Sequence, residues 1–185
     1  EVNFSGKRIG IIGTGSTAIQ IIPQVAKQAK HLHIFQRTAN YSLPARNGPL
    51  AEEKRAIHKK KYRELRKQAY STPFGIAGYP PPEKGAFEAT PKEREAKYHQ
   101  KWDEGGTISY LFSYNDLLLS EKSNETASDF VRERIREIVK DPETAKLLCP
   151  NDHPIGTKRI CLDSGYYETF NRDNVSLVDV RSAPI

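Results

Sequence analysis

The chain has 185 residues, of which 37% are hydrophobic and 28% are charged, and its formal net charge is +6. This length suits a single domain, and the apolar content is enough for a modest core and too high for a disordered chain. The chain contains no Met and starts with Glu1, so we expect a processed chain or a piece of a longer protein. No apolar run is long enough for a membrane span or a signal peptide, so we expect no membrane partner.

The sulfur and imidazole side chains give no sign of a disulfide framework or a metal centre. Cys149 and Cys161 form no Cys-x-x-Cys pair, which is typical of the free thiols of a cytoplasmic protein. The five His residues show no metal-binding spacing, although His31 and His33 would share one face of a strand. We therefore expect no metal site.

The first 36 residues predict a strand–helix–strand unit. Residues 8–12 are a short β-branched run that suits a buried parallel strand, and the turn GTGSTA follows at residues 13–18. Pro23 removes a backbone donor from the next segment and predicts a kink or an early helix end. Residues 31–36 predict the second strand, which completes a βαβ unit. The helix between the strands has one apolar face, made by Ile19, Ile22, Val25, Ala26 and Ala29.

Helices and loops are predicted from residue 41 to about residue 150. Leu43-Pro44 and residues 47–49 are loop signals. A basic helix is predicted over residues 50–70, and the Pro- and Gly-rich residues 71–87 predict a long loop. The basic helix has a narrow apolar stripe of Leu50, Ile57, Leu65 and Ala69.

Later in this region, capping signals mark two further helices. Thr90-Pro91-Lys92-Glu93 is a capping box, and the helix that it starts is expected to end at Gly105-Gly106. Leu117-Leu118-Leu119 is expected in a helix core, and another helix is predicted over residues 128–140. Asp141-Pro142 is expected to end that helix and to cap a short successor.

Strand character returns in the tail, at residues 159–162 and 175–180. We therefore expect an α/β protein, with a Rossmann-like domain built on a parallel sheet and a large, mainly helical insertion. Residues 1–44 and 151–185 would form the Rossmann-like domain in two segments, and residues 45–150 would form the insertion.

The turn Gly13-x-Gly15-x-x-Ala18 matches the fingerprint of a dinucleotide-binding βα turn. Gly13 permits the tight turn, Gly15 leaves room for a pyrophosphate, and the small Ala18 lets the helix pack closely on the strand. Ser16 and Thr17 add hydroxyl donors at the helix start. Glycine-rich turns are common, so a purely structural turn is the alternative, but the position between a strand and a helix favours dinucleotide binding.

The end of the second predicted strand favours NADP over NAD. NAD sites usually place an Asp or Glu about 20 residues after the first glycine. This chain has Arg37 there, followed by Thr38. A carboxylate would repel a 2′-phosphate, whereas a guanidinium binds it bidentately and a threonine hydroxyl adds a hydrogen bond. The alternative for Arg37 is a solvated charge at a strand end.

Four sequence blocks resemble the NADP-binding domain of the Baeyer–Villiger flavin monooxygenases, the family of the phenylacetone and cyclohexanone monooxygenases. They are residues 6–20 (GKRIGIIGTGSTAIQ), 35–41 (FQRTANY), 156–159 (GTKR) and 166–175 (YYETFNRDNV). The resemblance covers essentially the whole chain, including the helical stretch. It implies an FAD-dependent enzyme that uses NADPH and O₂ to convert a ketone into an ester or lactone.

The resemblance also implies roles for individual residues. Arg37, Thr38 and Lys158 would bind the 2′-phosphate of NADP. Arg159 would lie beside the flavin, where a permanently charged guanidinium can stabilise the anionic intermediates of the reaction. The pyrophosphate would be held by the turn and the start of the helix, at Gly13, Thr14, Gly15, Ser16, Thr17, Ala18 and Gln20.

Other parts of the family pattern are not in this chain. Residues 1–6 (EVNFSG) resemble the stretch just after the family's fingerprint, Phe-x-Gly-x-x-x-His-x-x-x-Trp. The family's N-terminal FAD-binding glycine motif and its C-terminal Ala-Thr-Gly motif are not found in residues 1–185. The resemblance therefore implies an NADP domain of a larger enzyme, inactive on its own. Its partners would be the FAD domain of the same parent chain, a small ketone and O₂.

Two alternatives stay open. An N- or S-oxidising flavin monooxygenase shares the plan of two Rossmann domains. A basic nucleic-acid-binding module is suggested by the net charge, but residues 54–67 hold eight basic residues and one Glu, a net +7, and the rest of the chain carries −1. A solvated helix face explains such a run more simply, so we expect no nucleic acid partner.

Overall fold

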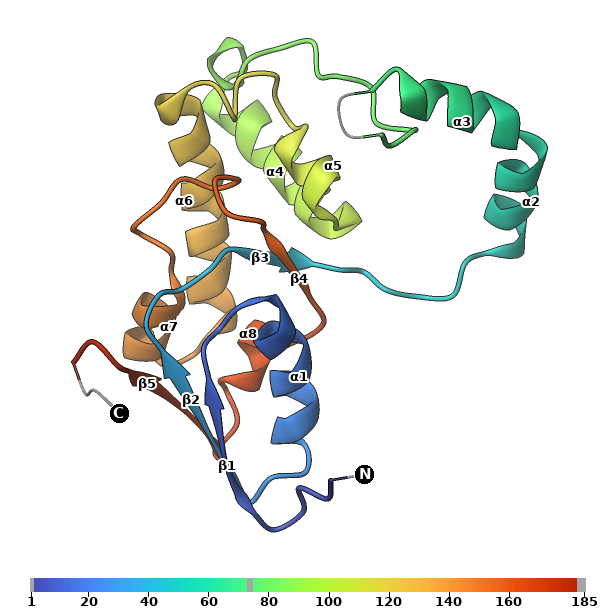
Figure 1. The fold of residues 1–185 in the computed structure, drawn as a ribbon. Coiled ribbons are helices and arrows are strands. Elements are labelled where there is room, and N and C mark those ends of the chain that lie inside the picture. The colour runs from blue at the N-terminus through green and yellow to red at the C-terminus, as the bar shows by residue number, and fades with distance from the viewer. Residues whose placement is uncertain (1, 73–74, 183–185) are drawn as a thin grey trace.

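The predicted strand–helix–strand unit forms one end of the molecule (Figure 1). The structure, a computed structural model, describes residues 2–72 and 75–182. Strand β1 (Arg8–Ile12), helix α1 (Ser16–Ala26) and strand β2 (His31–Gln36) follow one another, and β2 also pairs with β5 (Val175–Asp179). All pairs are parallel and the strand order is β1-β2-β5, so the predicted βαβ unit and parallel sheet are confirmed.

Helix α1 covers one face of this sheet because its apolar residues recur at helical spacing. Ile19, Ile22 and Ala26 are almost fully buried, and they belong to the same core as Leu32 and Ile34 of β2. Burial of each large aliphatic side chain stabilises the fold by about 1.5–3 kcal/mol. The helix ends three residues after its internal proline, so the early end predicted there is observed.

A second, smaller sheet corrects the prediction of a loop at Leu43-Pro44. Strand β3 (Ser42–Pro44) pairs in parallel with β4 (Cys161–Asp163). The Ser42 hydroxyl at the start of β3 donates to the carboxylate of Asp163 at the end of β4, at 2.6 Å. Pro44 is tolerated because it stands at the end of a short strand.

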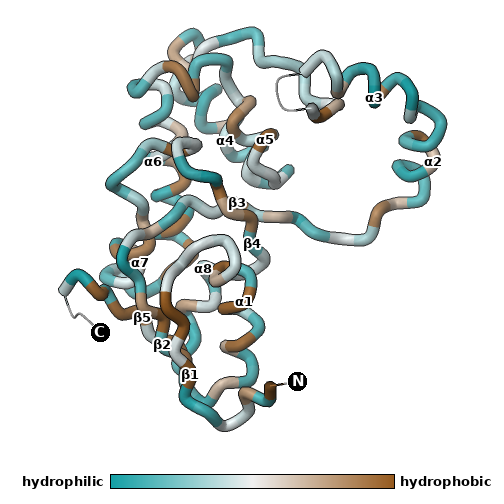
Figure 2. The backbone as a smooth tube through the Cα atoms, viewed as in Figure 1, coloured by the Kyte–Doolittle hydropathy of each residue, from teal (hydrophilic) through white to brown (hydrophobic). Residues whose placement is uncertain are grey.

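The prediction of one continuous basic helix over residues 50–70 is wrong, and so is the prediction that this helix packs through an apolar stripe. Two helices, α2 (Glu52–Lys60) and α3 (Tyr62–Tyr70), meet at Lys61, inside a run of like charges that weakens helical pairing. Neither helix buries a residue, so the predicted apolar stripe does not pack into the core. We call residues 52–70 the basic arm; it extends away from the body in Figure 1 and is mostly hydrophilic in Figure 2.

The body of the insertion begins after the basic arm. The described residues from 71 to 85 form no helix or strand, as predicted for this loop, and Pro73 of that prediction lies outside the described residues. A short 3-10 helix, η1 (Ala86–Glu88), leads to α4 (Pro91–Glu104) and α5 (Thr107–Leu111). The capping box at Thr90 is confirmed, and the glycines at residues 105 and 106 end α4 with positive φ angles of 75° and 87°.

Three more helices connect the insertion to the sheet: α6 (Glu121–Ile138), α7 (Pro142–Leu148) and α8 (Tyr166–Thr169). The helix predicted over residues 128–140 therefore starts seven residues earlier. The prediction of a helix core at Leu117–Leu119 is wrong, because these residues form a turn in which Leu117 is buried and Leu119 is 87% exposed. The predicted cap of α7 is confirmed by a 2.8 Å hydrogen bond from the Thr144 amide to the Asp141 carboxylate.

The expected fold class is confirmed as an α/β domain with a parallel sheet and a mainly helical insertion. Every helix in the described part of the chain is too short or too polar to span a membrane. Cys149 and Cys161 are buried and free, and residues 2–72 and 75–182 contain no group of three His, Cys, Asp or Glu side chains placed to bind a metal.

Candidate nucleotide site

The glycine turn, the end of β2 and the loop before β4 surround a hollow of about 500 Å³. This volume lies in the range of small-molecule and cofactor sites, roughly 300–1,000 Å³. The hollow lies at the carboxyl ends of β1 and β2, where parallel α/β sheets bind their ligands. Six of the predicted site residues line it: Gly13, Thr14, Gly15, Arg37, Thr38 and Lys158.

The backbone of the turn has the geometry that the glycine fingerprint requires. Gly13 has φ +91°, a conformation that other residues adopt only under strain, and its N–H donates to the carbonyl of Phe35 at 2.8 Å. Gly15 is the N-cap of α1 and offers no side chain to the first amides of the helix. The free amides at the N-terminus of α1, together with the helix dipole, favour an anion at this edge of the hollow.

Thr14 uses its side chain to hold the turn in place. The residue is 6% exposed, and its hydroxyl lies 3.1 Å from the carbonyl oxygen of Thr38 and 3.2 Å from Oε1 of Gln36. Gln36 in turn donates to the carbonyl of Leu147 in α7 at 2.7 Å. These hydrogen bonds connect the glycine turn to the end of β2 and to the insertion. Because the Thr14 side chain is already hydrogen-bonded, Thr14 would contact a pyrophosphate through its backbone.

Lys158 lines the hollow from the loop before β4. Its Nζ lies 3.4 Å from Nδ1 of His153, and that nitrogen lies 2.6 Å from the carboxylate of Asp152. The hydrogen bond from His153 lowers the pKa of the Asp152 carboxyl. An ionised Asp152 therefore lies close to Lys158 and attracts its ammonium group.

The other predicted site residues do not line this hollow. Ser16, Thr17 and Gln20 are exposed and Ala18 is half-buried, all on the first turns of α1. Arg159 is also exposed and lines a neighbouring hollow of about 370 Å³ under α5. Lys158 lines both hollows, whereas Arg159 lines the second one, so these two basic residues lie at neighbouring hollows.

Two residues of this region were missed in the sequence. Asn40 lines the hollow; its Nδ2 donates to Sγ of Cys161 at 3.2 Å, while its buried Oδ1 has no hydrogen-bond partner within the described residues. Arg181 reaches the hydroxyl of Thr38 from the end of β5. Asn40 could have been predicted from the sequence, because it lies three residues after Arg37. Arg181 could not, because its place depends on the pairing of β5 with β2, which no local pattern reveals.

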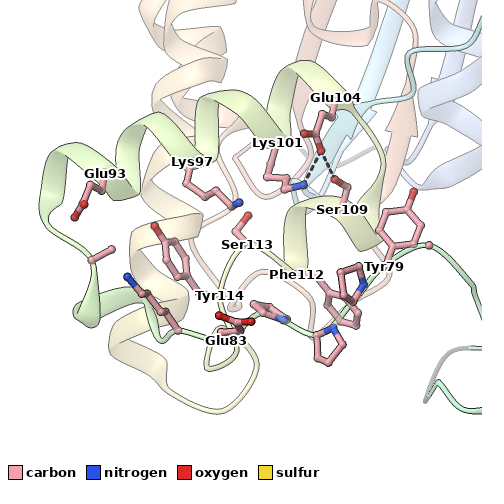
Figure 3. Close-up of a pocket in the computed structure, with 16 residues that line it drawn as sticks. Tyr79, Glu83, Glu93, Lys97, Lys101, Glu104, Ser109, Phe112, Ser113 and Tyr114 are labelled. Atoms are coloured by element: carbon pink, nitrogen blue, oxygen red, sulfur yellow. Dashed lines mark hydrogen bonds and ion pairs between the residues drawn. The ribbon is translucent and has the colours of Figure 1, made fainter.

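A larger hollow, of about 650 Å³, lies inside the insertion (Figure 3). Helices α4 and α5 and the proline-rich residues 78–84 surround it, and no predicted site residue lines it. Two of its charged groups are already paired, since Lys101 donates to Glu104 at 2.6 Å, and the same carboxylate accepts from Ser109 at 2.8 Å. The Glu104 carboxylate therefore joins α4 to α5.

The pairing of Glu104 predicts a pH-dependent stability. Hydrogen bonds from Lys101 and Ser109 lower the pKa of Glu104 from 4.5 to about 2. Because the folded state has the lower pKa, ionised Glu104 stabilises the fold above pH 4.5, and this contribution is lost as the pH falls toward about 2. Glu104→Gln should therefore lower the melting temperature near pH 6 and change it much less near pH 2.5, as measured by thermal unfolding.

The control for this experiment is Glu95→Gln, because Glu95 is an exposed residue of the same helix. It should leave the melting temperature almost unchanged at both pH values. A Glu104→Gln effect of equal size at both pH values would contradict the assignment.

The parallel sheet, the glycine turn and the basic side chains at the end of β2 together define a dinucleotide-binding domain of the Rossmann-like class. Its distinguishing feature is the helical insertion between the two halves of the sheet region.

Comparison with known proteins shows what the chain is similar to. A Baeyer–Villiger monooxygenase of Pseudooceanicola batsensis is 40% identical over 185 residues, which are 100% of this chain and 33% of that protein. The solved structure of an oxidised steroid monooxygenase bound to NADP is 49% identical, with a TM-score of 0.94, and the match covers 100% of this chain and 35% of that chain. The structure of OTEMO in complex with FAD and NADP is 42% identical, with a TM-score of 0.94, over 99% of this chain and 34% of that one.

The resemblance to the Baeyer–Villiger monooxygenases is thus confirmed along the whole chain, which matches one part of these flavoproteins. The chain spans about a third of the length of the curated relatives that it matches. No protein-family model matches it.

Proposed function

We propose that this chain binds NADP(H) and forms the NADP-binding part of an FAD-dependent Baeyer–Villiger-type monooxygenase. The parent enzyme inserts one oxygen atom of O₂ next to a ketone carbonyl and gives an ester or lactone. We assign the nucleotide site to the domain formed by residues 1–44 and 151–185, with residues 45–150 as its helical insertion.

One observation carries the preference for NADP: Arg37 and Thr38 line the same hollow as the glycine turn. With the pyrophosphate at the N-terminus of α1, the adenosine ribose reaches the end of β2, as in other Rossmann-like domains. Arg37 supplies a fork of donors for the 2′-phosphate, and Lys158 supplies a second positive charge. Among the described residues, no carboxylate lines this hollow to accept hydrogen bonds from an NAD ribose.

The residues that line the hollow fit NADP, and we expect FAD to be bound mainly outside this chain. The sequence has one GxGxxA turn, at residues 13–18, and this turn is used by the NADP site. FAD is therefore assigned to another part of the parent enzyme, where it supplies the activation of O₂. The contribution of this chain is to hold NADP(H) and to present the exposed guanidinium of Arg159, whose fixed charge stabilises negative charge that develops on the substrate.

The test of nucleotide binding is a titration of the 185-residue chain with NADPH and with NADH. The fluorescence of the reduced nucleotide is the signal that reports binding. Because the 2′-phosphate adds charge-assisted hydrogen bonds, NADPH should bind at least about tenfold more tightly than NADH. Equal affinities, or no binding of either nucleotide, would contradict the proposal.

The test of the reaction is a product analysis of the parent enzyme with a ketone, NADPH and O₂. An ester or lactone that carries one oxygen atom from ¹⁸O₂ is the expected product. Oxidation of amines or sulfides with ketones left unchanged would instead support the N- or S-oxidising alternative.

A further inference from the structure

Arg181 lies beside Thr38 because of the register of the sheet. Strands β2 and β5 pair in parallel with Gln36 opposite Asp179, and the amide of Val180 donates to the carbonyl of Gln36 at 3.0 Å. Two residues further along, the same register brings Arg181 next to Thr38. The carboxylate of Asp179 fixes this turn by accepting the backbone N–H of Arg181 at 3.0 Å.

The contact between the two side chains has a defined direction. Nη2 of Arg181 donates to Oγ1 of Thr38 at 3.1 Å, and a guanidinium can only donate, so the hydroxyl oxygen is the acceptor. The hydroxyl hydrogen of Thr38 is then turned away from Arg181, and within residues 2–72 and 75–182 it meets no acceptor. Since Thr38 lines the hollow of the nucleotide site, this hydrogen is available to a group bound there.

Charged side chains of both signs lie at this position. Arg37, Lys146 and Arg181 line a second hollow of about 230 Å³, which meets the nucleotide hollow at Arg37 and Thr38. The carboxylates of Asp152 and Asp179 also line it, so the basic side chains are in excess by one. The carboxylate of Asp152 lies 3.8 Å from Nη2 of Arg181 and restrains it loosely. The side chain of Arg181 is 57% exposed, so its other donors stay open to a ligand.

We propose that Arg181 is a further specificity-determining residue of the nucleotide site, a positioning residue that directs the Thr38 hydroxyl toward the 2′-phosphate of NADP. This inference rests on the proposed function. A nucleotide without the 2′-phosphate has only a ribose 2′-hydroxyl there and lacks the anionic phosphate oxygens that the arrangement would bind.

The experiment compares two ligands that differ by this phosphate, adenosine 2′,5′-bisphosphate and adenosine 5′-monophosphate. Their affinities for the 185-residue chain are measured by calorimetry. Because a charge-assisted hydrogen bond is weakened, Arg181→Gln should bind the bisphosphate about tenfold more weakly and the monophosphate within about twofold of wild type. In a Thr38→Val background the same substitution should cost less than about threefold, because the partner hydroxyl is already gone.

Arg63→Gln, in the basic arm, is the matched control and should change neither affinity. Three results would overturn the inference: unchanged bisphosphate binding in Arg181→Gln, equal losses for both ligands, or the same loss with and without the Thr38 hydroxyl. If these results occur while Arg37→Gln still weakens bisphosphate binding, the proposed function stands and the role of Arg181 fails alone. If the wild-type chain binds both ligands equally, both fail.

Discussion

Arg37→Gln should bind NADP about 30- to 100-fold more weakly than the wild type, because a bidentate guanidinium–phosphate contact is replaced by a neutral amide. The binding of NAD should change by less than about threefold, since NAD has no 2′-phosphate. Calorimetric titration of both nucleotides gives the two affinities and their ratio. The ratio is the informative quantity, because a general loss of structure would weaken both nucleotides together.

The stability of the same variant separates binding from folding. Arg37 is exposed at the end of β2, so its replacement should leave the melting temperature of the free chain within about 1–2 °C of wild type. Arg63→Gln removes an exposed arginine far along the chain, in the basic arm, and should bind NADP like the wild type. Unchanged NADP affinity in Arg37→Gln would contradict the placement of the 2′-phosphate.

Asn124→Ala should lower the free energy of unfolding by about 3–5 kcal/mol, because it leaves several buried polar groups without partners. Asn124 is 5% exposed, and its Nδ2 donates to the carbonyls of Leu117 and Ile155, each at 2.8 Å. Its Oδ1 accepts the N–H of Ile155 at 3.0 Å. One amide thus holds the start of α6 against the turn before it and against the loop that carries Lys158.

Chemical denaturation at pH 7 measures this loss. Asn115→Ala is the control, because Asn115 is exposed and its amide makes a single hydrogen bond to the carbonyl of Glu83, so the loss there should be below about 1 kcal/mol. A loss below about 1 kcal/mol in Asn124→Ala would contradict the structural role assigned to this amide.

The elements that the sequence predicted correctly are those that local interactions determine. The βαβ unit follows from a β-branched run, a glycine turn and helical spacing, all within 36 residues. The caps at Thr90 and Asp141 are likewise formed by groups three residues apart. Gly13, Arg37 and Thr38 could be predicted for the same reason, since a short helix must return the chain beside its first strand.

Other elements were mispredicted because burial of their side chains depends on the rest of the fold. Ser123, Asn124 and Ser128 look too polar for a packed helix, yet they are buried and hydrogen-bonded, partly to residue 155, so α6 starts earlier than predicted. Leu118 and Leu119 look like core residues, yet they are exposed in the turn before that helix. Hydrophobicity alone does not show which polar groups find partners across the fold.

The position of Arg181 shows the same limit at the candidate site. A basic residue near the end of the chain gives no local sign of its place. Only the pairing of β5 with β2 brings it to Thr38, across 143 positions of sequence. The parts of the site that depend on strand order therefore had to come from the structure.

A crystal structure of the chain with NADP would show directly where the nucleotide binds. We expect the pyrophosphate at the N-terminus of α1 and the 2′-phosphate within about 2.7–3.2 Å of donors on Arg37 and Thr38. A nucleotide bound in the hollow of the insertion, or one whose 2′-phosphate lies away from Arg37, would contradict this placement.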